Sequence, residues 1–229
     1  MVAAHNRSVC TTALDTAPVT DPTPRTGTAR FDDLVTQVYR AATGGASWED
    51  ALREVAHFFD AGAAVLHTYD LQHGRLLHLN AGGTRHEILG DALYDYTTTY
   101  GRLDPRKGRA LAAGAEGLGR WFHCHEAFDP GYVARDRSYQ HYILPYGVRY
   151  NANVTLPITP TIGTAFVLEL NAGRGPLDPD ERELARRLGQ QLQEALHAHE
   201  RMRHLLAQAL AGHGLLEAFA HPMWLLDGE

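Results

Sequence analysis

The residues best suited to chemistry gather between Trp121 and Tyr150. This segment holds eight aromatic side chains, one cysteine and three histidines, and its most distinctive members are His123, Cys124 and His125. Buried Tyr, Trp and His side chains bring polar tips into apolar surroundings, where each tip needs a hydrogen-bond partner. Ligand sites combine aromatic walls with a few convergent polar groups. The segment therefore predicts a small-molecule cavity, with an unusually polar piece of core as the alternative.

A metal or haem site is an alternative use of the same segment. On a strand, His123 and His125 would point to one face and could chelate together, while Cys124 would point to the other. Further ligands would have to come from distant histidines, for which the candidates are His67, His78 and His141. Adjacent ligand types without a second ligand cluster are a weak metal signal. We therefore expect no resident cofactor and keep a metal or haem sensor as an alternative.

Catalysis by Cys124 has little support in the sequence. A nucleophilic cysteine needs a base within hydrogen-bond reach, and a disulfide switch needs a second thiol. Sequence neighbours on a strand point away from the cysteine, and the only other one, Cys10, lies far away near the N-terminus. A free cysteine is commonly a small buried hydrophobic residue. We expect that the protein is not an enzyme.

Candidate ligand contacts extend beyond the cysteine. Tyr139 and Tyr142 are three residues apart and share one face of a helix, where they line the cavity or pack on a sheet. Arg149 and Asn153 lie on the polar face of an alternating strand, which faces either the cavity or solvent. In the first case Arg149 could pair with a ligand carboxylate. The predicted ligand-binding residues are Trp121, Cys124, Tyr139, Tyr142, Tyr146, Arg149, Asn153, His67 and His78.

The composition narrows the class of protein. The chain has 229 residues, is 44% hydrophobic and carries a net charge of −6, with Lys107 as its only lysine. A nucleic-acid-binding surface would be basic. No run of about 18 apolar residues occurs and no signal peptide opens the chain. We expect a cytoplasmic protein without membrane contact, formed by one sizeable domain with extensions.

The elements that must position these residues follow an α+β order. Residues 1–28 are rich in Thr, Ala and Pro and predict a disordered leader. Helical spacing then predicts two helices, separated by Gly44-Gly45 and by an N-cap at Ser47. A hairpin, two further helices and a second hairpin follow, and the expected ranges are Ala63–Asp70, Arg75–Ala81, Thr84–Tyr100, Arg106–Ala113, Val148–Leu156 and Thr164–Leu170. A turn at Pro145-Tyr146-Gly147 is expected just before the second hairpin. This order predicts an antiparallel sheet flanked by helices, with residues 84–145 covering one face.

The last predicted element is a long helix. Asp178-Pro179-Asp180-Glu181 combines an N-cap, a proline at the first helical position and a carboxylate at the third. An apolar stripe then continues for about 30 residues, roughly 45 Å, which exceeds the span of one small domain. A stripe that overhangs its domain usually meets another chain, although the helix could also bend onto its own core. The predicted dimer contacts are Leu188, Leu192, Leu196 and Met202. Gly212 and Gly214 are the expected end of the helix.

Three stretches of sequence resemble a known group. They are CHEAFDPGYVARDRSYQHYILPYGVRY (Cys124–Tyr150), YGRLDPR (Tyr100–Arg106) and GPLDPDERELARRL (Gly175–Leu188). They are similar to the N-terminal regulatory region of LuxR-type helix-turn-helix transcriptional regulators, and the order of elements resembles a GAF-type sensor domain. The ending PMWLLDGE is similar to the start of a PAS-like stretch. The segment does not resemble the acyl-homoserine-lactone-binding domain of quorum sensors, so those ligand contacts are not transferred.

The resemblance implies an organisation and a function. We expect a leader at residues 1–28, a GAF-like sensor core at 29–176, a long helix at 177–214 and the start of a PAS-like module at 215–229. The implied function is a ligand-sensing and dimerisation domain of a bacterial transcriptional regulator. Its partners would be a small-molecule effector, a second copy of the chain and, through a helix-turn-helix outside this sequence, DNA. A ligand-free dimerisation module is the alternative, beside the metal or haem sensor.

Overall fold

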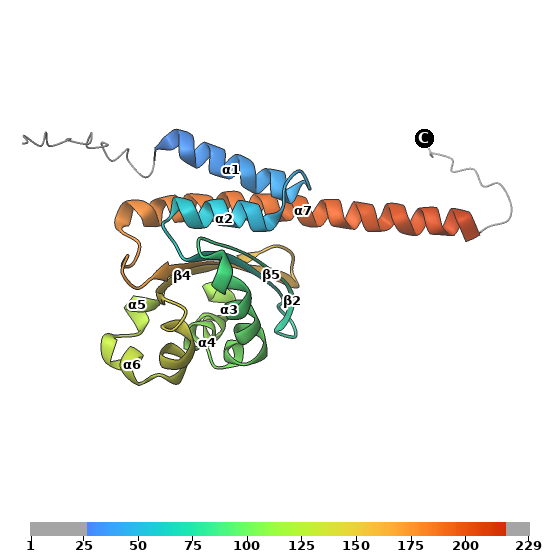
Figure 1. Cartoon of the computed structure of the whole chain (residues 1–229). Coiled ribbons are helices and arrows are strands. Elements are labelled where there is room, and N and C mark those ends of the chain that lie inside the picture. The colour runs from blue at the N-terminus through green and yellow to red at the C-terminus, as the bar shows by residue number, and fades with distance from the viewer. Residues whose placement is uncertain (1–26, 219–229) are drawn as a thin grey trace, which may run out of the picture.

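The computed structural model describes residues 27–218. The expected leader and the expected start of a following module lie almost wholly outside the described residues. Within them the expected fold class is confirmed: a single antiparallel sheet lies between two layers of helices, and a long C-terminal helix projects beyond the domain (Figure 1). None of the helices in this part of the chain is long and apolar enough to cross a membrane.

The sheet has five strands in the order β2-β1-β5-β4-β3. Its strands are β1 (Ala63–Asp70), β2 (Arg75–Gly83), β3 (Trp121–His123), β4 (Val148–Pro157) and β5 (Ile162–Asn171). Both predicted hairpins are confirmed, as β1–β2 and β4–β5. Strand β5 is central, as its mostly apolar sequence predicts, and it pairs antiparallel with both β1 and β4.

One face of the sheet carries α1 (Thr28–Ala42), α2 (Trp48–Phe58) and α7 (Pro179–Ala218) (Figure 1). Leu52 of α2, and Leu188 and Leu192 of α7, are fully buried against the sheet. Burial of each such side chain contributes about 1.5–3 kcal/mol. A local signal starts α2 as predicted. Ser47 caps α2 by accepting a hydrogen bond from the backbone of Asp50 at 3.0 Å.

Helix α7 begins as predicted and ends later than predicted. The side chain of Asp178 accepts from the backbone of Glu181 at 2.8 Å, and the side chain of Glu181 accepts from the backbone of Asp178 at 2.9 Å, which forms a capping box. The helix continues through Gly212 and Gly214 to Ala218, so the expected end there is wrong. A single glycine costs only about 1 kcal/mol in a helix, which leaves the helix intact.

The two halves of α7 have different surroundings. Three of the predicted dimer residues, Leu188, Leu192 and Leu196, are buried in the chain's own core, which corrects the expectation that they contact a second chain. Residues 201–211 are all exposed, and Met202 is among them. Figure 1 shows this half projecting past the domain.

The other face of the sheet is covered by residues 86–143, close to the predicted range of 84–145. The covering elements are α3 (His86–Thr98), η1 (Tyr100–Arg102), α4 (Pro105–Ala112), η2 (Gly114–Gly117), α5 (Cys124–Ala127), α6 (Pro130–Arg135) and η3, one turn of π-helix at Tyr139–Ile143. The aromatic segment is thus divided among β3, α5, α6, η3 and the first residues of β4. The segment therefore does not form one continuous layer over the pocket.

The polar face of β4 lies under these helices. Ala152, Val154 and Leu156 point into the core beside α7. Asn151 and Asn153 point to the opposite face, where they are 3% and 8% exposed. Polar residues that the sequence could assign to solvent are therefore buried in the layer that contains the site.

Candidate functional site

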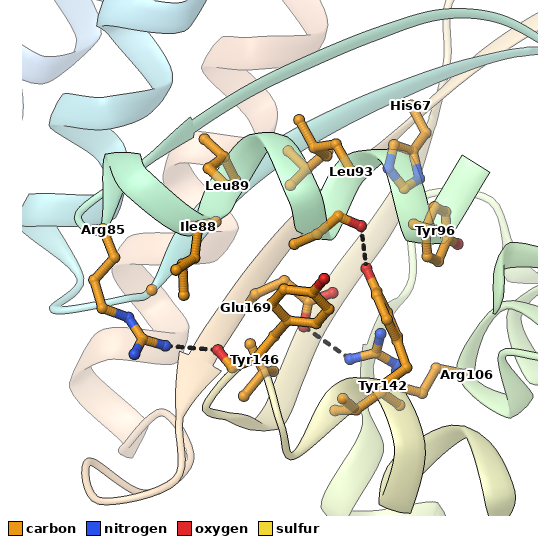
Figure 2. Close-up of a pocket in the computed structure, with 16 residues that line it drawn as sticks. His67, Arg85, Ile88, Leu89, Leu93, Tyr96, Arg106, Tyr142, Tyr146 and Glu169 are labelled. Carbon is orange, nitrogen blue, oxygen red and sulfur yellow. Dashed lines mark hydrogen bonds and ion pairs between the residues drawn. The ribbon is translucent and has the colours of Figure 1, made fainter. Parts of the chain in front are cut away.

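Two adjoining pockets lie between the sheet and its α3 cover. The first has an empty volume of about 700 Å³, its open mouth included. Apolar side chains of α3 form one wall, and Figure 2 shows Ile88, Leu89 and Leu93 projecting from that helix. Its lining also includes Val65, His67, Arg85, Ile88, Ala92, Tyr96, Arg106, Tyr142, Tyr146, Val148 and Glu169.

The second pocket continues along the sheet toward α4 and has an empty volume of about 770 Å³, again with its mouth. It is more polar, and its lining includes Tyr69, Asp70, Asp104, Lys107, Asn151, Asn153, Thr155 and Val167. The two pockets share four lining residues, which are His67, Tyr96, Arg106 and Glu169. These four form a common floor and wall, and they make the two pockets one candidate site with two lobes.

Aromatic rings form the wall between the lobes. The rings of His67 and Tyr96 are stacked with centroids 5.4 Å apart, and Tyr142 lies 6.0 Å beyond Tyr96. Tyr142 donates its hydroxyl hydrogen to the carbonyl of Ala92 at 2.9 Å, which ties η3 to α3 (Figure 2). Because its hydroxyl group is committed to the protein, Tyr142 presents its ring to the pocket.

A second set of hydrogen bonds borders the first lobe at Tyr146. Tyr146 donates its hydroxyl hydrogen to the carboxylate of Asp95 at 2.8 Å. Arg85 donates to the Tyr146 carbonyl at 2.6 Å (Figure 2). The chain turns here at Gly147, whose φ of +78° is the left-handed conformation that glycine adopts without strain. The predicted turn at Pro145-Tyr146-Gly147 thus places Tyr146 at the border of the first lobe.

A buried ionic network forms the floor. Arg106 donates through Nη1 to Oε2 of Glu169 at 2.8 Å, and through Nε and Nη2 to the carboxylate of Asp104 at 3.0 and 2.9 Å. The Arg106 and Asp104 side chains are each 5% exposed, and that of Glu169 is 19% exposed. Ion pairs in such surroundings are strongly coupled because little water screens them.

Burial and charge shift the pKa values on this floor in different directions. Burial raises the pKa of Glu169, and the neighbouring guanidinium of Arg106 only partly offsets that effect. Burial opposes ionisation of Asp104 too, but the charge and hydrogen bonds of Arg106 prevail and lower its pKa. Burial, with a smaller contribution from Lys107, lowers the pKa of His67 to about 4, so this imidazole is neutral at pH 7.

The structure places four of the nine predicted ligand-binding residues at this site. Tyr142 and Tyr146 line the first lobe, Asn153 lines the second, and His67 lines both. His78 lies elsewhere, in a groove on the α7 side of the sheet, where its Nε2 is 3.3 Å from Nη1 of Arg203.

The remaining four lie at the edge of the sheet, outside both lobes. Trp121 packs edge-on against Phe166, in the core on the α7 side. Cys124 and Tyr139 belong to a separate small core, where both are 0% exposed. Arg149 lies over the Tyr139 ring, 5.7 Å from its centroid.

The alternative metal site is not formed. The rings of His123 and His125 lie 6.0 Å apart, while the Cys124 sulfur accepts a hydrogen bond from the backbone of Asn151 at 3.1 Å. Nowhere between residues 27 and 218 do three metal-binding side chains converge. Burial raises the pKa of the Cys124 thiol. A buried thiol that resists ionisation fits a packing role.

Sequence reasoning missed Asp104, Arg106, Tyr96 and Glu169 as site residues. One signal was present, because Glu169 is the only charged residue in a strand that is otherwise mostly apolar. Arg106 pairs with it across 63 residues of sequence. That pairing depends on how α4 docks on the sheet, which no local pattern encodes.

Comparison with known proteins gives matches of structure alone. No protein-family model matches the chain, and no curated protein matches it in sequence. Solved structures that share its fold include two proteins with TM-scores above 0.5. CepR2 of Burkholderia cenocepacia, an N-acylhomoserine-lactone-dependent LuxR-family transcription factor, matches with 18% identity and a TM-score of 0.51, over 75% of this chain and 95% of that one. The VqsR ligand-binding domain of Pseudomonas aeruginosa matches with 12% identity and a TM-score of 0.54, over 76% and 98%.

The phycoerythrobilin-bound GAF domain of a cyanobacterial phytochrome matches with 11% identity and a TM-score of 0.49, over 77% of this chain and all of that one. CepR2 is a transcription factor, and the VqsR structure is that of a ligand-binding domain. The likeness to CepR2 is one of fold alone, so no lactone contacts are transferred to this chain. The chain thus shares the fold of the LuxR-family transcription factor CepR2 and of the VqsR ligand-binding domain.

Proposed function

We propose that this domain senses a small molecule, which binds in the two-lobed pocket between the sheet and α3, and that it regulates transcription as part of a LuxR-type regulator. The observation that carries the proposal is the pocket itself. It combines apolar and aromatic walls with a few convergent polar groups, as ligand sites do. The shared fold supports a sensing role. CepR2 is an N-acylhomoserine-lactone-dependent transcription factor, and the VqsR structure is that of a ligand-binding domain.

Strand β5 offers a route from the pocket to α7. Glu169 faces the pocket, whereas its neighbours Leu168 and Leu170 face the core that contains Leu188 and Leu192 of α7. A ligand that shifts β5 would therefore change the packing of the helix. Such coupling requires that the ligand bind two states of the domain with different affinities.

A substitution that fills the pocket tests this proposal. Leu89 is half-buried on α3 and lines the first lobe, so Leu89→Trp should occupy the ligand's space. Leu103→Trp is the matched control, because Leu103 is 54% exposed and lines neither lobe. A metabolite panel should raise the melting temperature of the wild type and of Leu103→Trp, since a bound ligand stabilises the folded state. Leu89→Trp should lose that response.

Two results would contradict the proposal. One is a panel that leaves the wild-type melting temperature unchanged at millimolar concentrations. The other is a hit that stabilises Leu89→Trp as much as the wild type, because that ligand would bind outside the pocket.

Self-association is a second function that a specific observation favours. Beyond the domain, α7 exposes four large apolar side chains, which are Met202, Leu205, Leu206 and Leu210. Apolar side chains repeated at helical spacing on a projecting helix are typical of a helix–helix contact between two chains. We propose that this distal stripe, and not the buried Leu188, Leu192 and Leu196, contacts a second copy of the chain.

A further inference from the structure

The floor of the pocket carries more negative than positive groups. Asp104 and Glu169 flank Arg106, so two carboxyl groups share one guanidinium. The charges that shift the pKa of Glu169 are those of Arg106 and Asp104. A buried carboxylate without a full counter-charge is costly, and it is relieved by a proton or by a positive partner.

Other titratable groups around Glu169 do not supply that partner at neutral pH. His67 is neutral because its pKa lies at about 4. Burial raises the pKa values of Tyr96 and Tyr142, which keeps both phenols neutral. Lys107 lies in the second lobe, with its Nζ over the ring of Tyr69 at 5.3 Å from the centroid.

Arg106 is poorly placed to bind an anionic ligand. Its Nε, Nη1 and Nη2 groups already donate to the two carboxylates. A ligand carboxylate would have to compete with both of them while it adds a third negative charge to the same floor. The pairing of Arg149 with a ligand carboxylate that the sequence allowed is not available either, because Arg149 lies outside both lobes.

Aromatic rings add a second attraction for a cation. Tyr96 lines both lobes beside Glu169, and the ring of Tyr142 lies 6.0 Å from that of Tyr96. The faces of such rings attract ammonium groups, and aromatic walls combined with a carboxylate are a recurrent way to bind them. Apolar side chains from α3, including Leu89 and Leu93, complete the wall of the first lobe (Figure 2).

We propose that the effector is a cationic amine on an apolar or aromatic skeleton, with its ammonium group bound by Glu169 and Tyr96 where the two lobes meet. The proposal rests on the proposed function, because it names the class of ligand for the same pocket. The ammonium group would supply the positive charge that the floor lacks. The skeleton would extend into the first lobe beneath α3.

Matched probes separate charge from shape. The probes are phenylethylamine, phenylpropanamide and phenylpropanoate, with the corresponding amine, amide and carboxylate of indole, each titrated calorimetrically into the full chain at pH 7. On each skeleton that binds, the amine should bind more tightly than the amide and the carboxylate by on the order of tenfold, the contribution of a charge-assisted hydrogen bond. An amide or carboxylate that binds as tightly as its amine overturns this inference and leaves the proposed function standing. If no probe binds at millimolar concentration, this inference fails, and the metabolite panel still decides the proposed function.

Two variants locate the charge. Glu169→Gln should weaken amine binding by about tenfold and leave amide binding within about twofold, while Glu183→Gln on the exposed face of α7 should change neither. Amine binding that survives Glu169→Gln overturns the inference. Glu169→Gln does not fold if it lacks the near-ultraviolet circular dichroism of the wild type. In that case the Tyr96→Leu variant tests the inference in its place. Tyr96→Leu should weaken the amine severalfold more than the amide, and an equal effect on both overturns the inference.

Discussion

At the scale of single residues, Glu169 shows how the site opposes stability. It interrupts a central strand whose other side chains fill the core, and burial raises its pKa. The ion pair with Arg106 offsets part of the cost of burying this carboxylate. However, a protein in which hydrophobic side chains replace a buried ion pair is often equally stable or more stable. Stability alone therefore gives no reason for a carboxylate at position 169. The proposed binding of a cationic ligand would explain why it is there.

His67 makes the stability of the domain depend on pH. Its folded-state pKa is lowered from 6.5 to about 4, mainly by burial, so between these values the unfolded chain takes up a proton that the folded chain refuses. Stability is therefore complete above pH 6.5 and falls as the pH is lowered toward 4. The slope approaches about 1.4 kcal/mol per pH unit, for a total of up to ~3 kcal/mol. Urea unfolding of His67→Gln across this range should show a flatter dependence than the wild type.

The control for this experiment is His57→Gln, because His57 is exposed on α2. Its pH dependence should match the wild type. A wild-type slope that persists unchanged in His67→Gln would place the titrating group elsewhere.

At the scale of elements, α7 serves two purposes along its length. Up to Leu196 it is a core helix, and from 201 to 211 its side chains are exposed. The double variant Leu205→Asp and Leu206→Asp should be monomeric at tens of micromolar, where we expect the wild type to dimerise, because charges in an apolar helix contact are costly. Its melting temperature should stay close to that of the wild type once association is accounted for. Light scattering measures the mass.

The matched control is Ala207→Asp and Ala211→Asp, two exposed positions on the opposite side of the helix at 3.6 residues per turn. It should associate as the wild type does. A monomeric wild type, or equal loss of association in both double variants, would remove the role proposed for the stripe.

Most elements could be predicted from the sequence because their signals are local. The Ser47 cap, the capping box at Asp178 and Glu181, and the turn at Gly147 each act within a few residues, and each lies where it was predicted. The end of α7 was predicted wrongly because a glycine weakens a helix without always ending it.

The site could be predicted only in part, for a physical reason. The alternating pattern of β4 showed that Asn153 lies on a polar face, but whether that face meets solvent or a pocket depends on what packs over it. Cys124 and Tyr139 belong to the segment from Trp121 to Tyr150, but they pack in a separate small core and not in the pocket. Arg106 lies in the first turn of a short helix and Asp104 just before that helix, in a stretch that carried no ligand signal.

At the scale of the whole molecule, the proposed regions for sensing and for association are separate. The pocket lies on one side of the sheet, and the exposed stripe lies on the far half of a helix that packs on the other side (Figure 1). A chain ending at Glu200 should keep the fold, since Leu196 is the last core residue of α7 among those described. It should bind ligand with the wild-type affinity and lose self-association.

Calorimetry with any ligand of the wild type, together with light scattering, measures both properties of the shortened chain. If its ligand affinity falls more than about tenfold, or if it remains dimeric, the two regions are not separable in this way.

The projecting half of α7 has a mechanical consequence. From Leu196 to Ala218 the helix rises about 33 Å at 1.5 Å per residue. It is anchored at one end by buried leucines, it touches the domain at Arg203, whose Nη1 lies 3.3 Å from Nε2 of His78, and its side chains are exposed along residues 204–211. Such a helix is a lever arm, so a tilt of about 5° at the fulcrum would carry its tip about 3 Å. A displacement at β5 that is too small to alter the fold could then move the far end of α7 by about 3 Å.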